Sequence, residues 1–88
     1  MTDPRPVATV DGIDYAPGGA YATCVGKAAN VREYVEAYAN QIDPGEDIDV
    51  VLADLLADLQ HYAAIVGVDW QSLLSTAAAN VEAERRGE

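Results

Sequence analysis

Apolar side chains recur at steps of three or four residues along the middle of the chain, between two signals that end helices. Such spacing places them on one stripe of an α-helix, which a globular protein buries. Asp43-Pro44 with Glu46 has the capping-box pattern of a helix start, and Gly67 suits the left-handed residue that ends a helix. The stripe consists of Ile48, Leu52, Leu55, Leu59, Tyr62 and Val66. The pattern predicts a long amphipathic helix over about 44–66.

Three further segments carry local signals. Asp69 can cap a helix over about 70–84, and Asn30 with Glu33 has a capping-box pattern that predicts a helix over about 30–41. Asp11-Gly12 between short apolar runs is typical of a β-hairpin, whereas residues 20–25 are compatible with a third strand or with the lead-in turn of the first helix. We therefore expect a mainly α single domain. A three-helix bundle within about 29–86 follows a short β-hairpin or extended N-terminal segment at about 1–28.

The size and composition of the chain leave little material for a core. It has 88 residues, of which sixteen are Ala and none is Phe. A domain this small has a thin hydrophobic core, and apolar surface that it cannot bury is available for self-association. We expect a homodimer.

The negative charge is concentrated in the helical part. The net charge is −10, and residues 33–84 contain eleven acids and no Lys or Arg. This field repels phosphate backbones and anionic lipids, so direct nucleic-acid binding and membrane binding are disfavoured. The N-terminal residues 1–6 lack an apolar run and Cys24 has no partner for a disulfide. These features predict a cytoplasmic protein, in the host cytoplasm if it is phage-encoded.

Four polar residues share one narrow face of the long helix, beside the apolar stripe. They are Asp47, Asp54, Asp58 and His61, at steps of seven, four and three. One interpretation, which we favour because acidic helix faces are common, is a solvated interaction face. The other is a site for Mg²⁺ or Mn²⁺, with His61 as a base for a metal-bound water.

A pair of glutamates on the preceding helix extends the metal hypothesis. Glu33 and Glu36 form an ExxE pattern, and facing Asp54 and Asp58 they would make a four-carboxylate metal site. Helix capping explains Glu33 without a metal. No catalytic residue is assigned.

Two resemblances bear on function. The run from Leu52 to Leu56, followed by Gly67-Val68-Asp69-Trp70, resembles small actinobacteriophage and mobile-element proteins of unassigned function, over about residues 46–84. More distantly, the chain resembles the MazG-type all-α nucleotide pyrophosphohydrolases, in which ExxE and ExxD pairs hold Mg²⁺. Val51 stands at the glutamate position of the second pair.

The first resemblance implies a phage-type accessory protein. Together with the acidic face, it predicts a non-enzymatic protein that binds a basic or mixed protein partner from the host or the phage, with no cofactor. The alternative is a MazG-like nucleoside triphosphate pyrophosphohydrolase, or a degenerate relative, that uses Mg²⁺ or Mn²⁺. A weaker alternative is a DNA-mimic inhibitor, which carries its acids at the spacing of phosphates.

Overall fold

A computed structural model describes residues 8–10 and 12–88. An antiparallel hairpin of β1 (Ala8–Val10) and β2 (Ile13–Tyr15) leads into helices α1 (Ala20–Ile42), α2 (Ile48–Val66) and α3 (Trp70–Arg85). The mainly α fold with an N-terminal hairpin is therefore confirmed. The hairpin's turn contains Gly12 at φ 79°, as the Asp-Gly signal predicted; Val7 and Asp11 lie outside the described residues.

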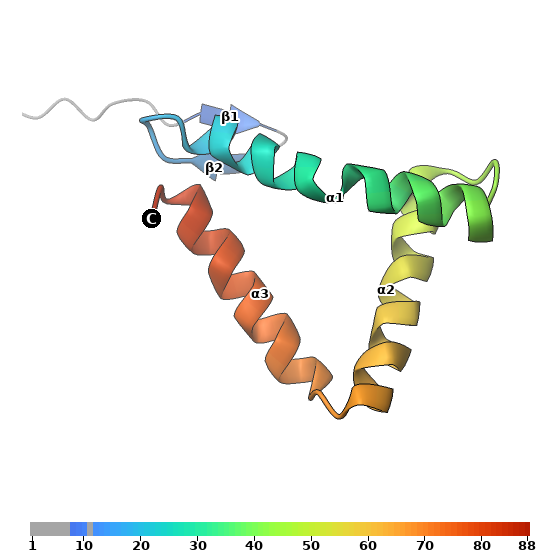
Figure 1. Cartoon of the computed structure of the whole chain (residues 1–88). Coiled ribbons are helices and arrows are strands. Elements are labelled where there is room, and N and C mark those ends of the chain that lie inside the picture. Colours follow the sequence, from blue (N-terminus) through green and yellow to red (C-terminus); the bar gives the residue numbers. More distant parts are fainter. Residues whose placement is uncertain (1–7, 11) are drawn as a thin grey trace, which may run out of the picture.

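The three helices form an open triangle, in which each helix meets the next only near its ends (Figure 1). One side chain is buried near each corner: Val51 where α1 meets α2, Ala63 where α2 meets α3, and Ala20 where α3 returns to the start of α1. These three are the buried hydrophobic residues of the described chain, and Val51 is the largest. The molecule is a helical bundle without a continuous central core.

The third corner joins the two ends of the chain. The Ala16 N–H donates to the Arg85 carbonyl at 2.7 Å, and the Lys27 ammonium lies 3.5 Å from the Glu84 carboxylate. The rings of Tyr15 and Tyr21 meet edge to face at 5.1 Å, which fixes the hairpin against α1. These contacts join the C-terminal end of α3 to the hairpin and to the first turns of α1.

Two helix starts differ from the sequence prediction. The first helix begins at Ala20, not near Asn30, because Gly19 at φ 92° breaks the chain and no proline interrupts the alanine-rich segment that follows. Residues 20–25 are thus its first turns, and Glu33 lies in its interior, where it caps nothing.

The second helix begins at Ile48 after Asp47, not at residue 44, because Gly45 at φ 84° completes a turn. Asp43 instead follows the end of α1, where its N–H donates to the Ala39 carbonyl at 3.0 Å.

The connection between α2 and α3 has the predicted chemistry. Gly67 has φ 81°; its N–H lies 3.4 Å from the Ala64 carbonyl and the Val68 N–H lies 2.9 Å from the Ala63 carbonyl, which is a Schellman motif. The Asp69 carboxylate accepts from the Ser72 N–H at 2.9 Å and so caps α3. Both residues have the roles predicted for them.

Candidate functional site

The corner between α1 and α2 gathers carboxylates from both helices and from the loop between them. We call this cluster the acidic corner. It consists of Tyr38 on α1, Asp43 and Glu46 in the connection, and Asp54 and Asp58 on successive turns of α2. Asp43 and Asp54 are half-buried, whereas Asp58 is exposed. Val51 is buried within the same corner, on the side of α2 that bears the two aspartates.

The Tyr38 hydroxyl connects the two helices across this corner. It donates to Asp58 Oδ2 at 2.6 Å. The hydrogen bond to Asp58 and, to a smaller degree, burial and the surrounding negative charges raise the pKa of Tyr38 to about 12. Tyr38 is therefore held as a neutral hydrogen-bond donor that ties α1 to an aspartate of α2.

Asp43 and Asp54 interact closely enough that one carboxyl affects the protonation of the other. Asp43 Oδ2 is shielded from solvent and receives no hydrogen bond from the described part of the protein. The hydrogen bond that a protonated Asp43 can donate to Asp54, followed by burial and the negative charges of Asp54, Glu46 and Asp58, raises the pKa of Asp43. When Asp43 is protonated, its O–H donates a hydrogen bond to the Asp54 carboxylate, which reduces the repulsion between the two groups and gives the shielded oxygen of Asp43 a partner.

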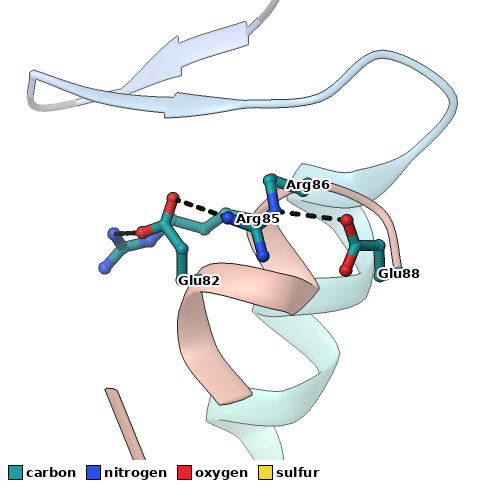
Figure 2. Close-up of polar contacts among 4 residues, drawn as sticks. All are labelled: Glu82, Arg85, Arg86 and Glu88. Atoms are coloured by element: carbon teal, nitrogen blue, oxygen red, sulfur yellow. Dashed lines mark hydrogen bonds and ion pairs between the residues drawn. The ribbon is translucent and has the colours of Figure 1, made fainter. Parts of the chain in front are cut away.

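Every Lys and Arg of the described chain pairs with acids outside this corner. Arg32 pairs with Glu36 at 2.9 Å within α1, and Lys27 pairs with Glu84. At the end of α3, Arg86 lies between Glu82 at 3.8 Å and Glu88 at 3.2 Å, and Arg85 lies 3.7 Å from Glu82 (Figure 2). Over residues 8–10 and 12–88, no ion pair neutralises the acidic corner. Its negative charge is left to solvent or to a partner.

The four-carboxylate metal site that the sequence offered as an alternative, formed by Glu33, Glu36, Asp54 and Asp58, is not assembled in the described residues. Glu36 lies about 200° around α1 from Tyr38, and Glu33 about 140°, so both point away from the side that meets α2. Within the described ranges, no group of three or more His, Cys, Asp or Glu side chains is placed to hold a metal ion. Asp54 and Asp58 are brought to Tyr38 and Asp43 instead.

The predicted acidic face of α2 is divided by the fold. Asp47 precedes the helix as its N-cap residue without a side-chain capping bond, and His61 is exposed one turn beyond Asp58. Asp54 and Asp58 belong to the acidic corner. Sequence reasoning missed Tyr38 and Asp43, because a tyrosine within a helical segment carries no local signal of a site and Asp43 was interpreted as the cap of the next helix.

A second surface feature lies at the corner between α2 and α3. Apolar side chains line an open groove of about 420 Å³ between the two helices. The groove contains no charged residue. Its lining residues include Leu56, Leu59, Tyr62, Val66, Trp70 and Leu73. We call it the apolar groove; it extends along α2 from Leu56 to the turn into α3, and none of the acidic-corner residues lines it.

Comparison of the chain with protein-family models, with curated proteins and with solved structures gives no match. Site roles therefore come from the geometry of this chain. Among the helices described, none is both long enough and apolar enough to cross a membrane.

Proposed function

We propose that this protein acts by binding rather than by catalysis, and that its acidic corner takes a basic segment of another protein. The resemblance to phage accessory proteins suggests a protein of the host or of the phage as this partner. The observation that carries the proposal is the crowding of Asp43, Asp54 and Asp58, which raises the pKa of Asp43, while every Lys and Arg of the described chain pairs with acids elsewhere.

The chemistry of the corner favours a cationic side chain as its ligand. A Lys ammonium or Arg guanidinium beside Asp54 and Asp58 would offset the repulsion between the carboxylates. It would also take the place of the proton on Asp43 as the positive partner of Asp54. The remaining net charge of the chain would increase the rate at which a basic segment arrives, and this effect decreases with salt.

Titration with a short arginine-rich peptide, followed by calorimetry at low and high salt, tests this proposal. The double variant Asp54→Asn/Asp58→Asn should weaken binding by about tenfold, because it removes two charges while keeping side chains that can accept from Tyr38. The control Asp14→Asn/Glu33→Gln removes two charges from exposed positions outside the corner and should bind almost as the native chain does.

Equal losses in the two double variants would show that the peptide responds to net charge alone and would contradict a site at the acidic corner. Failure of the native chain to bind at low salt would contradict it as well.

A further inference from the structure

The apolar stripe of α2 is largely exposed in the single chain. Leu52, Leu59 and Val66 are 43%, 45% and 50% exposed, and Tyr62 is 64% exposed. On the facing side of the apolar groove, Leu73 and Leu74 of α3 are 43% and 41% exposed. Helices with one apolar stripe obtain most of their stability by burying it. Here the three corner contacts leave that stripe open to water.

The dimensions of the molecule also show that a single chain buries less surface than a compact domain does. Its radius of gyration is 16.2 Å, whereas a compact domain of this length has about 12 Å. The accessible surface is 6733 Å², against about 5,000 Å² for a compact monomer of this mass. The excess of about 1,700 Å² per chain is in the range that each subunit buries in an obligate homodimer, and half of it equals one side of a standard interface.

The charge distribution decides which occupant fits the groove. A basic segment has no counter-charge there, because the lining residues are uncharged. Helical geometry places Leu59 and Val66 about 80–140° around α2 from Asp54 and Asp58. Two copies can therefore bring their apolar stripes together while their acidic faces remain at the edge of the contact. This arrangement avoids the repulsion expected between two chains of charge −10.

We infer that a second copy of this chain closes the apolar groove, so that α2 and α3 of two chains pack their apolar faces against each other in a homodimer. A two-fold contact uses the same patch on both subunits, which suits a groove lined by apolar side chains on both walls. The inference does not depend on the proposed function, because none of the residues of the acidic corner lines the apolar groove.

Sedimentation equilibrium and thermal unfolding over a range of concentrations test the inference. The native chain should have twice the monomer mass of 9.3 kDa, and its Tm should rise with protein concentration, because dimerisation stabilises the folded state by mass action. Leu59→Asp places a charge in the groove of each subunit and should weaken the dimer by roughly 100-fold or more.

Ile65→Asp is the matched control on the same helix. Ile65 is 82% exposed, lies outside the groove and is on the acidic side of α2, so this variant should remain dimeric. Asp54→Asn/Asp58→Asn should also remain dimeric, which separates this test from that of the acidic corner.

If Leu59→Asp fails to fold and the Tm of the native chain rises with concentration, the inference is supported, because folding then depends on the dimer contact. A native chain that is monomeric at about 100 μM with a concentration-independent Tm overturns it. A dimer that tolerates Leu59→Asp also overturns it, as does a monomer whose groove takes only a foreign amphipathic peptide.

Discussion

The two ends of α2 are built by opposite means. At its C-terminal end, the turn from Gly67 to Asp69 is held by a Schellman motif and a side-chain cap, and it adjoins an uncharged groove. At its N-terminal end, a longer connection has no side-chain cap, and the corner with α1 contains the buried Val51, the Tyr38–Asp58 hydrogen bond and a group of crowded carboxylates. Backbone capping defines one corner, and packing with side-chain protonation defines the other.

This difference shows where each corner is vulnerable. A turn fixed by its own backbone depends on residues that are adjacent in sequence, and it tolerates the exposure of its surroundings. The acidic corner depends on pairs such as Tyr38 and Asp58, which are twenty residues apart. We expect a single substitution in the turn to alter the structure only locally. A single substitution in the acidic corner is expected to separate α1 from α2.

The largest effect is expected from Val51→Ala at the acidic corner. Val51 is 1% exposed, and shortening it removes buried apolar surface and leaves a cavity, which should cost about 2 kcal/mol of unfolding free energy. The neighbouring Val50 is 38% exposed, so Val50→Ala should cost clearly less. Urea unfolding followed by circular dichroism measures both. Similar losses would mean that the corner has no packed centre.

A smaller effect on stability is expected from replacing Gly67 at the other corner, and it should be opposite to the effect of replacing a glycine inside a helix. Gly67→Ala forces an L-residue to φ 81° and should cost about 1 kcal/mol, although no atom lies within 4 Å of the added Cβ. Gly26→Ala in the interior of α1 also meets open space, without positive φ, and should stabilise the protein by about 0.5–1 kcal/mol. Thermal unfolding of the two variants should therefore shift in opposite directions; shifts of the same sign would refute the backbone role of Gly67.

The smallest effects should appear in the pH dependence of stability. The Asp43 carboxyl at one corner should make the protein less stable as pH rises, whereas the Asp69 carboxyl at the other should make it more stable. The pKa of Asp43 is raised above its ordinary 3.8, so its stabilising contribution is present below that value and is lost as pH rises through the raised pKa. The Ser72 N–H and then its hydroxyl lower the pKa of Asp69, so its contribution is present above 3.8 and is lost as pH falls.

Asp43→Asn should therefore remove the loss of stability that occurs as pH rises above the ordinary pKa of Asp43. Asp69→Asn should reduce the loss of stability that occurs as pH falls. Urea midpoints between about pH 3 and pH 7 measure both slopes. An unchanged upper slope in Asp43→Asn would show that Asp43 does not hold its proton against Asp54.

Much of the local structure could be predicted from the sequence because its signals act over a few residues. The Asp-Gly hairpin, the end of α2 at Gly67 and the cap of α3 at Asp69 are of this kind. The starts of α1 and α2 were misplaced because Asn30 and Asp43 have the chemistry of caps, and the surrounding chain determines whether that chemistry is used. Tyr38 and Asp43 could not be assigned to a site, since their partners on α2 come near only when the helices are placed.

By itself, the sequence determined that this chain forms three helices with a short hairpin, that one stripe of α2 is apolar, and that the negative charge is concentrated in residues 33–84, which contain no Lys or Arg. Periodicity, capping and charge count are properties of neighbours along a chain, and they need no tertiary contact. Only the tertiary structure decided that the acids at one end of α2 meet Tyr38 and Asp43 rather than Glu33 and Glu36, and that the apolar stripe remains exposed. Both outcomes depend on the angle at which helices meet, which is set by contacts between residues far apart in the chain.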